Sequence, residues 1–127
     1  MTLIVRYKLV VLLILSLVVF SCTYEKIEIT DELPQNVSFQ NDLIPLFNQS
    51  CNSIGCHNTG GIPPDLSVDN SYQDLTTIAN MIDLESPENS TIYVRMIDTQ
   101  SPMPLSGVMN YESQQVLAWI KEGAQNN

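Results

Sequence analysis

The chain carries the stretch Cys51-Asn52-Ser53-Ile54-Gly55-Cys56-His57 near its middle. It has 127 residues, and His57 is the sole histidine among them. Two thiols and the imidazole therefore stand within one short segment. We expect the chemistry of the chain, and the helices that support it, to be organised around this segment.

Two cysteines followed directly by a histidine are what covalent haem attachment requires. The thiols add across the two vinyl groups of haem, and the imidazole beside the second thiol becomes an axial ligand of the iron. The usual spacing is C-x-x-C-H, whereas four residues separate Cys51 from Cys56 here. Gly55 tolerates unusual backbone angles, so it would let the extra residues bulge without strain.

The same residues allow two other interpretations. In an oxidising compartment, Cys51 and Cys56 form a matched pair that a disulfide could join, which would make a haem-free, disulfide-stapled binding or scaffold protein. A zinc or redox-thiol site would use the same three side chains. Zinc needs a fourth ligand, and ligands so closely bunched surround one ion poorly.

Residues 1–22 look like an export signal. Arg6 and Lys8 precede a predominantly apolar run of 12 residues, Leu9 to Phe20, which suits a signal-peptide core and is short for a membrane span. The run ends at Ser21-Cys22, which resembles a bacterial lipobox and implies cleavage before Cys22 and acylation of that residue. An uncleaved N-terminal anchor is the alternative. Either way we expect a membrane-tethered protein of the bacterial cell envelope, on the periplasmic or outer-membrane side.

Residues 23–127 are strongly acidic. They hold Lys26, Arg95 and Lys121 against all 14 acidic residues, a net charge of −11 with histidine neutral. This balance argues against nucleic acid and anionic lipid surfaces as partners. The charges are spread evenly, which is more typical of a solvated surface than of a docking patch for a basic protein.

The pattern of apolar residues predicts an all-α domain. We expect a tether over residues 23–36 and one domain over residues 37–127, with three to four helices and no strand. The helices are expected from near Asn41 to Cys51, over Ser71–Ile82, from Asn89 or Ser90 through Ile97, and over about Tyr111–Glu122 with Asn110 as cap and Gly123 as terminator. Two Gly/Pro-containing loops, residues 58–66 and 99–107, separate them.

Taken together, residues 39–124 resemble a monohaem c-type cytochrome domain. A helix enters the cysteine–histidine segment, a loop ending in Pro64-Asp65-Leu66 follows, and then comes Met103 between two prolines. The resemblance implies a small cytochrome c-like fold packed around haem c. It implies that Cys51 and Cys56 hold the haem, and that His57 and Met103 ligate the iron. A backbone carbonyl near Pro63 or Pro64 would accept a hydrogen bond from Nδ1 of His57.

The choice of Met103 depends on its surroundings. Met81 and Met96 fall within predicted apolar helical stripes, where methionine usually packs in the core. Met109 also lies in a loop and is the reserve candidate. Trp119, with Tyr93 and Tyr111, could line a haem, but core packing is the simpler expectation for these aromatic residues.

A haem iron with histidine and methionine ligands has no open position, which suits the transfer of single electrons. We therefore expect an electron-transfer protein, and not an enzyme, that exchanges electrons with a redox partner protein. The sequence offers no Ser/His/Asp set, no phosphate-binding glycine loop and no calcium-loop pattern.

Overall fold

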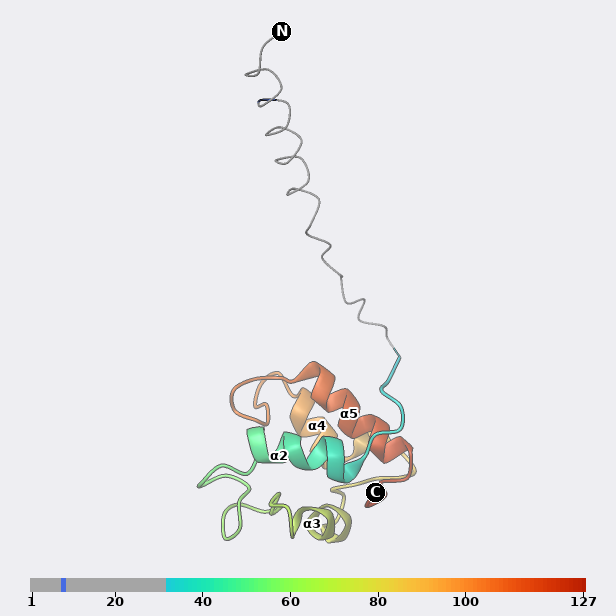
Figure 1. Cartoon of the computed structure of the whole chain (residues 1–127). Coiled ribbons are helices and arrows are strands. Elements are labelled where there is room, and N and C mark those ends of the chain that lie inside the picture. Colours follow the sequence, from blue (N-terminus) through green and yellow to red (C-terminus); the bar gives the residue numbers. More distant parts are fainter. Residues whose placement is uncertain (1–7, 9–31) are drawn as a thin grey trace. The chain divides into compact units, whose positions relative to one another are not determined.

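The computed structural model describes residue 8 and residues 32–127 (Figure 1). The predicted export signal, Cys22 and most of the predicted tether lie outside the described residues. Within the described part, no helix is both long enough and apolar enough to cross a membrane.

Residues 32–127 form helices joined by loops and contain no strand, which confirms the all-α class. The elements are a π-helical turn and a short 3-10 helix together with four α-helices. They are η1 (Phe39–Leu43), α2 (Ile44–Ser50), α3 (Ser71–Thr77), η2 (Pro87–Asn89), α4 (Thr91–Ile97) and α5 (Asn110–Lys121).

The first helical segment starts earlier than its expected start near Asn41. Ser38 caps η1, because its Oγ accepts a hydrogen bond from the Asn41 amide at 3.1 Å and its own amide donates to Asp42 Oδ2 at 2.8 Å. These reciprocal bonds satisfy amides that have no helical partner. Pro45 stands in the first turn of α2, where its missing N–H costs nothing. Pro45 thus lies at the junction of η1 and α2.

The second predicted helix, Ser71–Ile82, is wrong in length, because α3 ends at Thr77. Thr76 Oγ1 donates to the Tyr72 carbonyl and Thr77 Oγ1 donates to the Gln73 carbonyl, each at 2.7 Å. Such back-bonding by threonine competes with the helical ladder. Ile78 is then extended, and Asn80 turns the chain with a φ of 62°.

The last two helices lie close to where the apolar pattern places them. Ser90 occupies the N-cap position of α4, as one of the two expected starts. Helix α5 begins one residue before its expected start, so Asn110 is its first residue and Met109 takes the cap position. Gly123 ends α5 with a φ of 99°, and its amide donates to the Ile120 carbonyl at 3.0 Å.

An aromatic cluster centred on Phe39 holds η1, α2, α3 and α5 together. The ring of Phe39 lies 5.1 Å from that of Trp119, 5.2 Å from that of Tyr72 and 6.1 Å from that of Phe47. Trp119 is 1% exposed, and its Nε1 donates to the Gln125 carbonyl at 2.8 Å. Burial of large aromatic side chains contributes much of the stability of a domain this small.

The described end of the predicted tether is attached to this core. Leu33 packs against the core residues, and the amides of Asn36 and Val37 donate to the two carboxylate oxygens of Glu122 at 2.7 and 3.0 Å. Two long loops, residues 51–70 and 98–109, lie at the same end of the domain (left in Figure 1).

Candidate functional site

A cavity of about 570 Å³ lies where these two loops meet α2 and α4. Its wall is mostly apolar, and its volume falls in the range of sites that bury a cofactor or a small ligand. The four residues expected to hold the haem all line it: Cys51, Cys56, His57 and Met103.

Local turns bring both cysteines and the histidine to this cavity despite the four-residue spacing. Cys51 continues the helical pattern of α2, since its amide donates to the Phe47 carbonyl at 2.9 Å. The chain then turns back, and the His57 amide donates to the Cys51 carbonyl at 3.2 Å. Gly55 adopts a φ of 84°, with no heavy atom within 4 Å of the position its Cβ would take. The extra residues therefore form an outward bulge in which the positive φ favours glycine at position 55.

The His57 ring is oriented by two backbone carbonyls of the loop that follows it. Nδ1 lies 2.9 Å from the Ile62 oxygen and 3.2 Å from the Pro64 oxygen. Carbonyl oxygens only accept hydrogen bonds, so Nδ1 carries the hydrogen in the neutral ring, and the lone pair is on Nε2. The expected partner was near Pro63 or Pro64, and the shorter contact is to Ile62.

The loop beneath the ring is itself held by backbone hydrogen bonds. The Ile62 amide donates to the Cys56 carbonyl at 2.8 Å, and the Leu66 amide donates to the His57 carbonyl at 2.7 Å. Pro64 and Leu66 are buried and line the cavity. These contacts fix the ring relative to both thiols, so an imidazole ligand would need little rearrangement on binding a metal.

The two cysteines are free and half-buried. Burial, with a smaller contribution from Cys56, raises the pKa of the Cys51 thiol to about 11. Cys51 is therefore protonated at neutral pH, whereas redox-active thiols and zinc ligands react as thiolates. Among the described residues, no group of three or more His, Cys, Asp or Glu side chains could hold a metal ion.

The four described methionines of residues 32–127 differ in their surroundings. Met81 and Met96 are buried in the core and also border the cavity. Met103 is half-buried in the loop after α4, and its amide donates to the Arg95 carbonyl at 2.9 Å. Met109 packs against the core and is not part of the cavity wall. The cavity thus includes the preferred loop methionine and excludes the reserve candidate.

The three aromatic residues that could have lined a haem, Tyr93, Tyr111 and Trp119, are not part of the cavity wall, whereas Phe47 of α2 is. Trp119 is in the core, as expected, and neither it nor Tyr93 lines the cavity. The expectation of core packing is wrong for Tyr111, which is 60% exposed in the first turn of α5.

Sequence reasoning missed Arg95. Among the described residues that line the cavity, it is the one permanently charged side chain in a mostly apolar wall. It lies three residues after Ile92 in α4, so the two share a helix face. A basic residue on the apolar face of α4, in a segment with so few basic residues, was the signal that could have identified it.

Comparison with models of protein families, with curated proteins and with solved structures gave no match. The chemistry of the site therefore has to be argued from its own geometry. Around a single apolar cavity, that geometry offers two thiols, one imidazole nitrogen with a free lone pair and three thioethers, of which Met81 and Met96 are buried and Met103 is half-buried.

Proposed function

We propose that this protein is an electron-transfer protein that carries a covalently attached c-type haem in the cavity, within a cytochrome c-like domain. One observation carries the proposal. Cys51, Cys56, His57 and Met103 were singled out from sequence motifs, and they line one apolar cavity although Met103 follows His57 by 46 residues.

The residues present fit a haem in several ways. The wall is apolar, as a porphyrin face requires, and both thiols are free to form thioethers. The two carbonyls at Nδ1 of His57 orient the ring and leave Nε2 available to iron. When bound, a haem with imidazole and thioether ligands supplies a one-electron Fe(III)/Fe(II) couple.

The remaining residues define how such a site would work. The side chains of Phe47, Leu66 and Ile92 would pack against the bound group and keep water from it, and Met103 would provide a soft sulfur ligand that favours Fe(II). With His57 and Met103 on the iron, no position is left for a substrate. We propose a carrier and not an enzyme, and electrons would pass to and from a separate redox partner protein.

The experiment is to produce the protein in a host that exports it and attaches haem. The reduced protein should show sharp α and β absorption bands, and it should keep its haem when denatured. Replacing both cysteines, Cys51→Ala with Cys56→Ala, should leave no haem on the denatured chain. Ser50→Ala is the matched control, because Ser50 lines the cavity without a thiol. A colourless parent protein from this host would contradict the proposal and favour the haem-free, disulfide-stapled alternative.

We also propose that Cys22 is the acylated first residue of a mature lipoprotein in a bacterial cell envelope. The support is the apolar run that ends in Ser21-Cys22. Replacing Cys22 by alanine should move the protein from the membrane fraction to the soluble fraction or block its processing. A Cys22→Ala variant that stays membrane-bound with the parent's electrophoretic mobility would exclude lipidation at this residue.

A further inference from the structure

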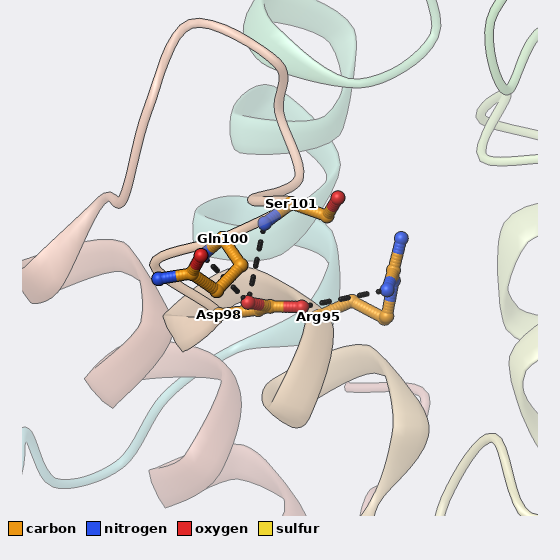
Figure 2. A network of polar contacts seen from close by, with 4 residues as sticks. All are labelled: Arg95, Asp98, Gln100 and Ser101. Atoms are coloured by element: carbon orange, nitrogen blue, oxygen red, sulfur yellow. Dashed lines mark hydrogen bonds and ion pairs between the residues drawn. The ribbon is translucent and has the colours of Figure 1, made fainter.

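The segment between α4 and Met103 is organised by one carboxylate, that of Asp98. Helix α4 ends at Ile97, and Asp98 leaves it in an extended conformation. Figure 2 shows Asp98 Oδ1 accepting hydrogen bonds from the amides of Gln100 at 2.8 Å and Ser101 at 3.2 Å. An aspartate that bonds to the backbone two residues ahead forms an Asx turn, which fixes a tight change of chain direction.

Arg95 connects both ends of this segment. Asp98 Oδ2 lies 3.6 Å from Arg95 Nη1 (Figure 2), and the Arg95 carbonyl accepts the hydrogen bond from the Met103 amide at 2.9 Å. That carbonyl belongs to the last turn of α4, where carbonyls have no helical partner. Asp98 turns the chain back, and the turn brings the Met103 amide onto the end of the helix.

Resting on the haem site proposed above, we propose that Asp98 is a positioning residue that holds Met103 in place as the sixth ligand of the iron. Of the four proposed site residues, only Met103 lies outside the segment Cys51–His57. Its backbone anchor is the bond to Arg95, and the turn that leads to that anchor is fixed by the Asp98 carboxylate. Loosening the turn should therefore weaken sulfur ligation before it affects the attachment of the haem.

The carboxylate is ionised under the conditions where the site would work. The hydrogen bonds from Gln100 and Ser101, followed by the charge of Arg95, hold the pKa of Asp98 below its ordinary value. An ionised acceptor binds backbone amides more strongly than a neutral one.

The chain provides a matched control in Asp83. Its Oδ1 accepts from the amides of Glu85 and Ser86, both at 2.9 Å, in a turn of the same type. This turn lies before η2, on a segment without Met103, and Asp83 is not part of the cavity wall. Loss of either turn should destabilise the domain to a similar extent, whereas only loss of the Asp98 turn should affect Met103.

The experiment measures how tightly imidazole displaces the methionine sulfur from the ferric, haem-loaded protein. Asp98→Ala should raise the apparent affinity for imidazole by roughly tenfold, since two hydrogen bonds to a charged acceptor are lost. Asp98→Asn keeps an oxygen acceptor but no charge, and should raise the affinity by about threefold. Asp83→Ala should stay within about twofold of the parent.

Each outcome has a defined meaning. Equal affinity in the parent, Asp98→Ala and Asp83→Ala would overturn the role of Asp98 and leave the haem proposal intact. An equal rise in Asp98→Ala and Asp83→Ala would also overturn it, because the effect would then be general. If Asp98→Ala takes up no haem, the test depends on Asp98→Asn alone. An imidazole affinity of Asp98→Asn equal to that of the parent would then overturn the positioning role of Asp98. A parent without haem contradicts the proposed function itself.

Discussion

Alanine substitutions at Met96 and Met103, two of the three methionines that line the cavity, should distinguish the proposed iron ligand from a core residue. Met96 is 4% exposed and belongs to the buried core, so Met96→Ala should lower the free energy of unfolding by about 2–5 kcal/mol. Met103 is half-buried in a loop, so its truncation should cost about 1 kcal/mol or less in packing. The effect on the iron should be the reverse. Met103→Ala should abolish the weak far-red sulfur-to-iron band of the ferric protein, and Met96→Ala should keep it.

The free energy of unfolding must report side-chain packing without a contribution from the iron–sulfur bond. Urea unfolding is therefore measured on ferric protein saturated with cyanide, in which cyanide replaces the sulfur in every variant. The far-red band and the reduction potential are measured without cyanide. Met103→Ala should lower the potential, because a soft ligand that favours Fe(II) is lost.

Met109→Ala is the control for this series, since Met109 packs on the core from a loop but does not line the cavity. It should keep the band. If Met109→Ala removes the band and Met103→Ala does not, the ligand is Met109 and the electron-transfer function still stands. If neither removes it, the sixth ligand is neither Met103 nor Met109, and a ligand-sensing or catalytic role becomes the better hypothesis.

Two further predictions concern the loop beneath His57. A Cβ on Gly61 would collide with the Cys56 carbonyl oxygen, so Gly61→Ala should lower the free energy of unfolding in urea by about 1–3 kcal/mol and lower the haem content. Gly60→Ala is the control, because a Cβ there meets no atom within 4 Å. It should keep the haem content, although a φ of 78° makes alanine strained at this position. Hydrogen bonds to Asp65, the strongest of them from Ser67, hold the pKa of its carboxyl at about 2, below the ordinary 3.8. The ionised carboxylate therefore stabilises the folded domain fully above about pH 4, and this stabilisation is lost as the pH falls towards 2. The difference in urea midpoint between the parent and Asp65→Asn should therefore shrink in acid, and a difference that widens would contradict this assignment.

The helices were predictable where burial alone sets the pattern. The apolar stripe of α5, with Val116 and Ile120, faces the core, and Gly123 ends the helix as its backbone freedom suggests. Periodicity failed at α3, since Thr76 and Thr77 bond back to the helix and Asn80 adopts a positive φ. Side-chain competition of this kind is local and leaves no trace in the spacing of apolar residues.

The candidate residues that line the cavity could be identified from the sequence, whereas the contacts that hold them in place could not. A histidine beside a cysteine, and a methionine between prolines, are visible in the sequence as chemistry. The contact of His57 with the Ile62 carbonyl, and the use of Asp98 to turn the chain towards Met103, depend on loop geometry that sequence periodicity does not encode. The same limit explains why Arg95 was missed as a cavity residue.

The most direct test of the account is the intact mass of the protein from a host that attaches haem. The haem-loaded protein should have a mass one haem above that of its processed, acylated polypeptide, unchanged by acid–acetone extraction, with neither Cys51 nor Cys56 reactive towards thiol reagents. The two cysteines cannot form thioethers and a disulfide at once. A mass two hydrogens below that of the thiol form, without haem, would show that they form a disulfide and would contradict the account.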